Sequence, residues 1–124
     1  MDLSPRRFAN VVVLSLVGRI DHAASDAFRA ALDPHLATCS AEEDRLVLDA
    51  SALEYISSAG LRVLILAQKR VKPNGGSLVV AAPQEMVREI FEISRFSTIF
   101  KIYRTVRLAL EDVSPAALDA YGQG

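Results

Sequence analysis

Hydroxyl and carboxyl side chains gather in one short stretch of the sequence, directly before a long amphipathic helix. The stretch contains Asp49, Ser51, Glu54, Tyr55, Ser57 and Ser58, and Ala59 and Gly60 follow it. A serine at the start of a helix can accept hydrogen bonds from the free backbone N–H groups of the first turn, which typically contributes about 1 kcal/mol. The same N–H groups and the helix dipole also favour a covalently attached phosphate. A structural cap and a phosphorylation site are therefore both consistent with this stretch.

The two consecutive serines allow these roles to be separated. Ser57 can cap the helix, whereas Ser58, one step further on, can point its hydroxyl toward solvent and partners. A phosphate on that hydroxyl would carry a charge of roughly −1.5 to −2, and it would oppose a partner surface built for a neutral group. We therefore expect Ser58 to act as a switch.

Apolar runs and helical periodicity predict the elements that position this stretch. Buried strands are expected at residues 11–17, 45–49, 78–82 and 100–103, with a further edge strand near 6–9. Helices are expected at residues 24–37, from Ser57 or Ser58 to Pro73, after Pro83, and at 105–110. Strands that alternate with helices indicate an α/β fold. We expect a single domain with a central, mostly parallel sheet of about four or five strands, covered by about four helices.

Two loops of this predicted fold, at residues 18–22 and 49–58, follow parallel strands and so lie at the same edge of the sheet. Functional groups usually gather at that edge. Asp21 would then lie near the switch serine and could bind a partner or orient the serine, but an acidic residue in such a loop can equally be a cap. Asp49 and Ser51 are expected to be structural loop residues, because an aspartate after a strand often hydrogen-bonds its own turn.

Length and charge restrict the classes of function. The chain has 124 residues, enough for one domain, which we place at residues 1–112, with a loosely attached C-terminal tail at 113–124. Fourteen basic and fifteen acidic residues give a net charge of −1, which offers no general attraction to nucleic acid or to anionic membranes. The apolar runs are too short for a membrane span and do not resemble a secretory signal, so a cytoplasmic location is expected.

Metal, cofactor and enzyme chemistry find little support. Cys39 is the only cysteine, which excludes an intrachain disulfide and paired cysteine ligands. His22 and His35 lie on different segments without ligands at a suitable spacing, so no metal site is expected. The sequence has no phosphate-binding loop, no dinucleotide fingerprint and no Gly-x-Ser-x-Gly elbow. We therefore expect neither a cofactor nor an enzymatic activity.

Several motifs of the chain together resemble one known family. Leu48-Asp49-Ala50-Ser51, followed by Tyr55-Ile56-Ser57-Ser58-Ala59-Gly60-Leu61-Arg62, is similar to the signature stretch of bacterial STAS domains in anti-sigma factor antagonists. Gly18-Arg19-Ile20-Asp21 resembles a turn of that family, and Gly75-Gly76-Ser77-Leu78-Val79-Val80 and Val87-Arg88-Glu89-Ile90-Phe91-Glu92-Ile93-Ser94 resemble its later strand and helix. The resemblance covers residues 11–110.

This resemblance implies a partner-switching cycle. The unmodified protein would bind an anti-sigma factor that is also a serine kinase of the histidine-kinase-like ATPase type, and sigma factor would be released. Phosphorylation would end the complex, and a PP2C-like phosphatase would restore it. By position the family's phosphorylated residue falls on Ser58, although the common Asp-Ser-Ser-Gly form is replaced here by Ser57-Ser58-Ala59-Gly60. The expected partner-binding residues are Asp21, Ser57, Ser58, Ala59, Gly60 and Arg62.

Two other functions are compatible with the same fold. The chain could be a constitutive scaffold subunit of a stressosome or of a lipid-transport complex, with a purely structural serine. It could also be a small-molecule or nucleotide sensor that uses a pocket at the strand ends, although no sequence motif supports that reading.

Overall fold

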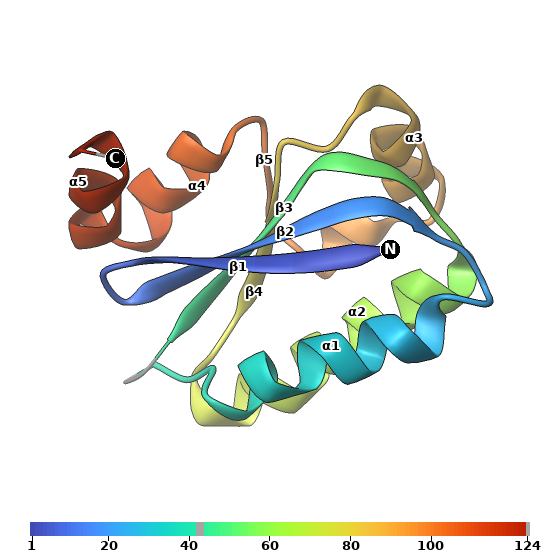
Figure 1. Ribbon diagram of the computed structural model, residues 1–124, viewed down its shortest axis with the longest axis horizontal. Helices are drawn as coiled ribbons and strands as arrows, with labels where there is room; N and C mark the ends of the chain where they lie inside the picture. The colour runs from blue at the N-terminus through green and yellow to red at the C-terminus, as the bar shows by residue number, and fades with distance from the viewer. Residues whose placement is uncertain (42–43, 124) are drawn as a thin grey trace.

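A five-stranded mixed sheet forms the centre of the protein, and the computed structural model describes residues 1–41 and 44–123 of it. The strands, in spatial as well as chain order, are β1 (Asp2–Phe8), β2 (Val11–Ile20), β3 (Arg45–Ile56), β4 (Leu78–Ala81) and β5 (Ile102–Tyr103). Strand β1 is antiparallel to β2, and the remaining pairs are parallel (Figure 1). The predicted α/β class, with a mostly parallel sheet in a single STAS-like domain, is confirmed.

Helices cover both faces of this sheet. They are α1 (Ser25–Ala37), α2 (Ser58–Val71), α3 (Glu85–Ile93), α4 (Val106–Val113) and α5 (Pro115–Gln123), with short 3₁₀ turns at Lys72–Asn74 and Phe96–Thr98. Helices α1 and α2 lie on one side of the sheet, and α4 and α5 lie on the other (Figure 1). Helix α3 shares a large apolar core with α1 and α2, whereas α4 and α5 share a smaller core with the opposite face. The described residues thus form one helix more than the sequence pattern indicated.

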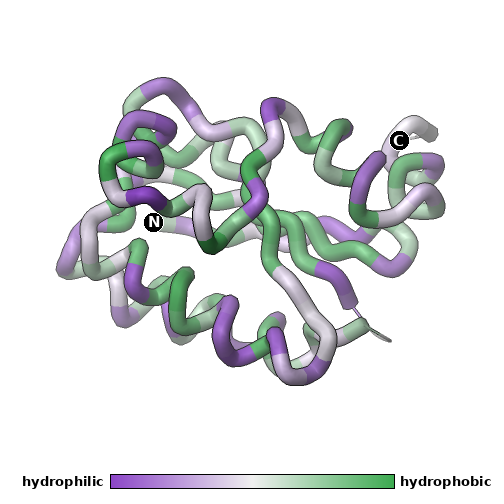
Figure 2. Tube along the Cα trace, turned by 180° about the vertical axis from the view of Figure 1, so that it is seen from behind, coloured by the Kyte–Doolittle hydropathy of each residue, from purple (hydrophilic) through white to green (hydrophobic). Residues whose placement is uncertain are grey.

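Alternate residues of the central strands supply the two cores. In β2, Leu14 and Leu16 face α1 and α2, whereas Val11 and Val13 face α4 and α5. A strand that is buried on both faces must be apolar nearly throughout, which is why β2 begins as an uninterrupted apolar run. Figure 2 shows the consequence: hydrophobic strands lie between helices that carry hydrophilic turns on their outer sides.

Strand β3 is longer than its sequence pattern suggested. The segment 49–58 was expected to be a loop, but pairing with β2 continues to Ile56, and only Ser57 separates β3 from α2. Two register shifts interrupt the pairing of β2 with β3. Such bulges break the alternation of inward and outward side chains. The sequence of the second half of β3 therefore resembles that of a polar loop. The loop prediction for Asp49 and Ser51 is therefore wrong.

The C-terminal segment is also more ordered than expected. Residues 115–123 form helix α5, which packs on the sheet face that carries Phe8, and Ala117 is completely buried there. The Ser114 hydroxyl hydrogen-bonds Asn10 Oδ1 at 2.6 Å, and the rings of Phe8 and Tyr121 meet edge to face. The expectation of a loosely attached segment is wrong because the hairpin of β1 and β2 has an apolar side that this helix covers.

Candidate phosphorylation and partner-binding site

The carboxyl ends of β2 and β3 bring the two functional loops together. Ile20 and Ile56 are paired in the parallel register, and the Ser57 N–H donates a hydrogen bond to the Ile20 carbonyl at 2.8 Å. Asp21 and His22 directly follow the first of these strands, and Ser57 and Ser58 directly follow the second. The sequence-based expectation that both segments share one edge of the sheet agrees with this geometry.

Ser57 is the N-cap of α2. Its backbone is extended (φ −81°, ψ 170°), and its hydroxyl oxygen accepts a hydrogen bond from the Gly60 N–H at 3.2 Å. The Ser57 carbonyl accepts the next bond, from the Leu61 N–H at 2.9 Å. This hydroxyl is therefore committed to the start of the helix, as the cap interpretation predicted.

Ser58 is the first residue of α2, and its side chain is exposed. Within residues 1–41 and 44–123, no side-chain hydrogen bond of Ser58 is present, so its hydroxyl is open to solvent. The first turn also contains no acidic side chain that would repel an added phosphate. The two serines thus differ in the way that their positions in the sequence suggested.

Gly60 fixes the helix start against the sheet. A Cβ atom at this position would lie 2.8 Å from both Ile20 Cγ2 and Ile56 Cγ1, which are far inside van der Waals contact. Only glycine lets α2 begin this close to the ends of β2 and β3. Its contribution to the site is therefore to set the position of Ser57 and Ser58.

Asp21 has a structural partner. Its Oδ1 accepts a hydrogen bond from the Ala24 N–H at 2.9 Å, in the turn that leads into α1. The side chain is nevertheless exposed at the same end of the sheet as Ser58. This bond holds the loop from β2 to α1 in place, and among the described residues helix α1 itself has no side-chain cap.

Asp49 and Ser51 lie further inside the sheet, at the first bulge of β3. Asp49 Oδ1 accepts a hydrogen bond from the Ser51 N–H at 3.0 Å, so the expected bond of an aspartate to its own turn is present, but inside a strand. The Ser51 carbonyl accepts a bond from Gln84 Nε2 at 2.8 Å. Both residues therefore stabilise the bulge and its link to the start of α3.

A groove runs along the outer side of α2 from Ser58. It encloses about 650 Å³ and is lined by His22, Ser58, Ala59, Leu61, Arg62, Ile65, Leu66 and Lys69. Leu66 is 45% exposed, which is unusual for a leucine in a helix that packs on a core. The lining of the groove combines apolar side chains of α2 with the cationic side chains of Arg62 and Lys69. We name this set of residues the α2 groove.

The sequence analysis missed part of this groove. It identified Ser58, Ala59 and Arg62, but it assigned the apolar residues of α2 mainly to the core. The helical spacing from Ser58 through Arg62 and Leu66 places these residues on one side of the helix, and this signal was available in the sequence. His22 was considered only as a metal ligand, whereas it lines the groove from the preceding loop.

The described residues also bear on metal binding and on membrane insertion. No group of three His, Cys, Asp or Glu side chains converges on a possible metal position within 1–41 and 44–123. None of the helices in this part of the chain is long and apolar enough to cross a membrane. The site consists of the exposed Ser58 hydroxyl at the start of α2 and the partly apolar α2 groove next to it.

A mixed sheet with an antiparallel edge strand and helices on both faces defines a single α/β domain, which carries an exposed serine at a helix start. The chain belongs to the STAS domain family, whose model matches residues 3–109. The resemblance found in the sequence motifs is thereby confirmed.

Known relatives agree with this assignment. A protein of Bordetella bronchiseptica named "Putative anti-sigma factor antagonist BtrV" is 37% identical over 102 residues, which are 82% of this chain and 85% of that protein. The crystal structure of an anti-sigma factor antagonist from Mycobacterium paratuberculosis superimposes with a TM-score of 0.80 at 26% identity, covering 90% of this chain and 92% of the other.

The anti-sigma factor antagonist SpoIIAA shares the fold in two states. Its unphosphorylated form matches with a TM-score of 0.72 at 18% identity, covering 90% of this chain and 96% of that one. The phosphorylated form of SpoIIAA from Bacillus matches with a TM-score of 0.66 at 18% identity, covering 91% of this chain and 100% of the other. At this identity the likeness shows a common fold.

Proposed function

We propose that this protein is an anti-sigma factor antagonist that works by partner switching. In its unmodified form it binds an anti-sigma factor, a serine kinase of the histidine-kinase-like ATPase type, so that sigma factor is released. Phosphorylation of Ser58 abolishes this binding, and a PP2C-like phosphatase reverses the modification. The observation that carries the proposal is the exposed Ser58 hydroxyl at the start of α2, next to a cap that Ser57 supplies independently.

Phosphorylation at this position leaves the fold intact. Ser57 provides the cap, and Gly60 provides the packing against the sheet, so a phosphate on Ser58 replaces no structural contact among the described residues. The helix dipole and the free N–H groups of the first turn favour the added negative charge. The modified protein is therefore expected to fold normally and to differ at its surface.

The change at the surface is large because the start of α2 carries no charged side chain. Ser58, Ala59, Gly60 and Leu61 are all uncharged. A phosphate would place a charge of roughly −1.5 to −2 beside the apolar wall of the α2 groove. A partner that covers the groove would have to bury this charge, which is strongly unfavourable without a compensating group.

Arg62 gives the phosphate a second effect. It lies four residues after Ser58 on the same side of α2 and also lines the groove. An acidic group that precedes a basic one by four residues is the favourable order for a pair on a helix. Phosphorylated Ser58 would therefore attract Arg62 and withdraw its guanidinium from the partner. Asp21 and Ala59 flank the same surface and complete the proposed contact region.

The test uses the intact protein and purified anti-sigma kinase. After incubation with ATP, intact-mass analysis of the wild type should show one added phosphate, which is absent from Ser58→Ala. The matched control is Ser57→Ala, which removes the neighbouring hydroxyl and should still be labelled. Labelling of Ser58→Ala to the same extent as the wild type would refute the assignment.

Binding provides the second half of the test. Ser58→Ala should bind the kinase as the wild type does, whereas Ser58→Asp should bind at least about tenfold more weakly, a difference of about 1.4 kcal/mol. Equal affinities would contradict a charge-based switch. Recovery of the same large assembly with both variants, independent of ATP, would instead favour the scaffold function.

A further inference from the structure

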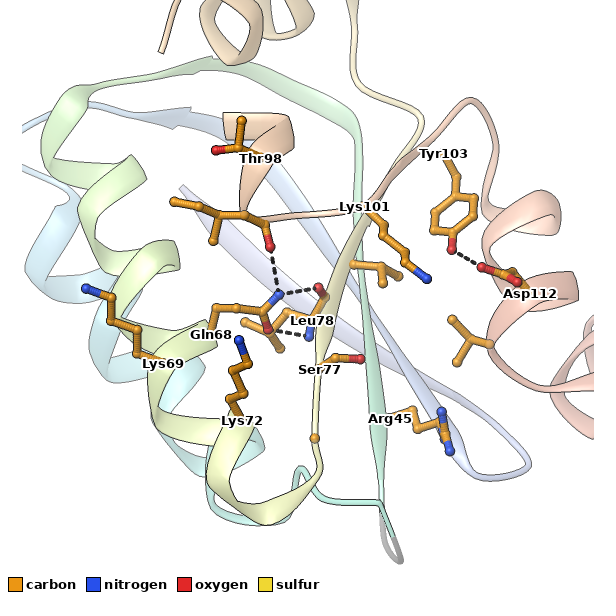
Figure 3. Close-up of a pocket in the computed structure, with 14 residues that line it drawn as sticks. Arg45, Gln68, Lys69, Lys72, Ser77, Leu78, Thr98, Lys101, Tyr103 and Asp112 are labelled. Atoms are coloured by element: carbon orange, nitrogen blue, oxygen red, sulfur yellow. Dashed lines mark hydrogen bonds between the residues drawn. The ribbon is translucent and has the colours of Figure 1, made fainter. Parts of the chain in front are cut away.

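A second cavity lies at the edge of the sheet, at the other end of α2 from Ser58. It encloses about 640 Å³ between the end of α2, the start of β4, the segment leading into β5, and α4 (Figure 3). Strand β5 pairs only with Val80 and Ala81, so it leaves the start of β4 uncovered. We name this cavity the edge cleft; residues that define it are Gln68, Lys72, Ser77, Leu78, Lys101 and Asp112.

Gln68 closes the exposed strand edge inside the cleft. Its Oε1 accepts a hydrogen bond from the Leu78 N–H at 2.8 Å, and its Nε2 donates to the Leu78 carbonyl at 3.1 Å (Figure 3). The amide side chain thus occupies the positions that a neighbouring strand would use. A peptide cannot add to β4 here without displacing it, so the cleft suits a small ligand better than an added strand.

The charges around the edge cleft are unusual for this chain. The protein has only three lysines, Lys69, Lys72 and Lys101, and all three line this cavity together with Arg45. Within residues 1–41 and 44–123, no carboxylate lies within 4.0 Å of any of the three lysine ammonium groups. A chain with a net charge of −1 therefore carries a strongly positive cavity.

The single acidic side chain of the lining does not neutralise this charge. Asp112 accepts a hydrogen bond from the Tyr103 hydroxyl. Burial and the neighbouring Asp112 raise the pKa of Tyr103 to about 12, so the phenol stays protonated as the donor. Asp112 keeps its negative charge in this pair, but four cationic side chains against one carboxylate leave the lining with a net positive charge.

The helix dipole accounts for only part of this arrangement. Lys69 and Lys72 lie at the C-terminal end of α2, where a positive charge is favourable in any protein. Lys101 directly precedes β5 and lies on none of the helices, yet it lines the same cavity. Apolar side chains lie between these charges, among them Ile99, which is 44% exposed, and Val113.

We propose that the edge cleft binds a small organic anion, with its phosphate or carboxylate group held by Lys72 and Lys101 and its apolar part against Ile99 and Val113. The cleft begins at Gln68, 10 residues after Ser58 on α2, which is about 15 Å along the helix at 1.5 Å per residue. Binding at this site is a property beyond the proposed partner switching and does not depend on it.

The experiment is a titration of the full-length protein, labelled with ¹⁵N, followed by NMR. The probes are phenyl phosphate, benzoate and the uncharged benzyl alcohol. At least one anion should give saturable shifts at the amides of Ser77, Lys101 and Tyr103, with a Kd on the order of 1 mM for a ligand of about ten non-hydrogen atoms. Comparison of the first two probes shows whether phosphate or carboxylate is preferred.

The double variant Lys72→Gln/Lys101→Gln tests whether charge drives the binding. Both lysines are exposed, so the fold should persist, and the amide spectrum verifies this. Its affinity should fall about tenfold, whereas the matched control Arg29→Gln, on the exposed side of α1, should bind as the wild type does. The proposal would be overturned by any of three results. These are the absence of saturable shifts with either anion at about 10 mM, equally large shifts with benzyl alcohol, and a double variant that binds the anion as tightly as the wild type.

Discussion

The two ends of helix α2 are held against the sheet by different means. At its start, Gly60 has no side chain, and Ile20 and Ile56 fill the space where one would lie. At its end, the amide of Gln68 pairs with the backbone of Leu78 on the edge of β4. The first contact is apolar and depends on shape, whereas the second is polar and depends on hydrogen-bond geometry.

The two ends of α2 also differ in the charges that surround them. The first turn of α2 has no charged side chain, so one phosphate would determine the electrostatic potential there. The other end carries three lysines around one cavity, so its potential is permanently positive. The start of the helix is therefore suited to a reversible switch, and its end to constant attraction of an anion.

The largest effect should come from filling the space at Gly60. The Gly60→Val variant places new carbon atoms against two buried isoleucines, and overpacking of this kind costs typically 1–3 kcal/mol. We expect a loss of about 3 kcal/mol in the free energy of unfolding, measured by urea denaturation. Because the helix start must shift, kinase binding should weaken in the fraction that remains folded.

Gly122 is the matched control for this substitution. It lies in α5, and within residues 1–41 and 44–123 no atom beyond its chain neighbours and the backbone of its own helix lies within 4 Å of the position where a Cβ would be added. Gly122→Ala should leave stability unchanged or raise it slightly, because alanine favours helices. A Gly60→Val protein as stable as the wild type would show that α2 can move away from the sheet at no cost.

The contact at the other end of α2 should be the next most sensitive. Gln68→Ala leaves the N–H and the carbonyl of Leu78 without protein partners, and an unpaired buried polar group costs about 1–3 kcal/mol. Water can enter the cleft, so we expect a loss of about 1.5 kcal/mol in unfolding free energy. Gln68→Glu keeps an acceptor for the Leu78 N–H and should lose less. If Gln68→Ala were as stable as the wild type, the hydrogen bonds of Gln68 to the edge of β4 would make no contribution to the free energy of unfolding.

The contacts at the start of α2 could be predicted from the sequence, whereas those at its end could not. The cap at Ser57 and the helix that follows are local features, set by residue types within a few positions, and they were predicted almost to the residue. The role of Gln68 depends on Leu78, ten positions later, and on a strand edge that β5 leaves open. In the sequence Gln68 occupies one place in an apolar stripe, which gives no indication of this partner.

Non-local packing also explains the other differences from the sequence-based expectations. Strand β3 continues to Ile56 because β2 pairs with it across two bulges, and these bulges disturb the alternation that identifies a strand. The segment of helix α5 was expected to be a loose tail because it contains Pro115, Gly122 and Gly124. The small side chains of Ala117 and Ala120 instead pack on the face that contains Phe8.

A smaller effect is expected from the cap itself. Ser57→Ala removes the acceptor for the Gly60 N–H and should lower the free energy of unfolding by about 1 kcal/mol. Ser57→Asn, whose side chain is an equally good cap, should retain most of that stability. Ser58→Ala is the comparison within the same turn and should unfold like the wild type. Equal losses in Ser57→Ala and Ser58→Ala would contradict the division of roles between the two serines.

The smallest effect concerns an ion pair at the same end of the sheet as the edge cleft. Arg7 pairs with Asp44 at 2.8 Å, and the Thr38 hydroxyl donates a second hydrogen bond to that carboxylate. The hydrogen bond from Arg7, with a further contribution from Thr38, lowers the pKa of Asp44 below its ordinary value. A carboxylate with a lowered pKa in the folded state stabilises the protein above its unfolded pKa of about 3.9, and this contribution is lost as the pH falls through the folded value.

Urea unfolding of the wild type and of Asp44→Asn between pH 3 and pH 7 measures this contribution. The wild type should be slightly more stable than the variant at pH 5–7, and the difference should narrow as the pH falls below about 4. The difference should remain small throughout, because exposed ion pairs contribute little. A stability difference that grows on acidification would show that Asp44 is protonated more easily in the folded protein. In that case the ion pair with Arg7 would not hold the start of β3.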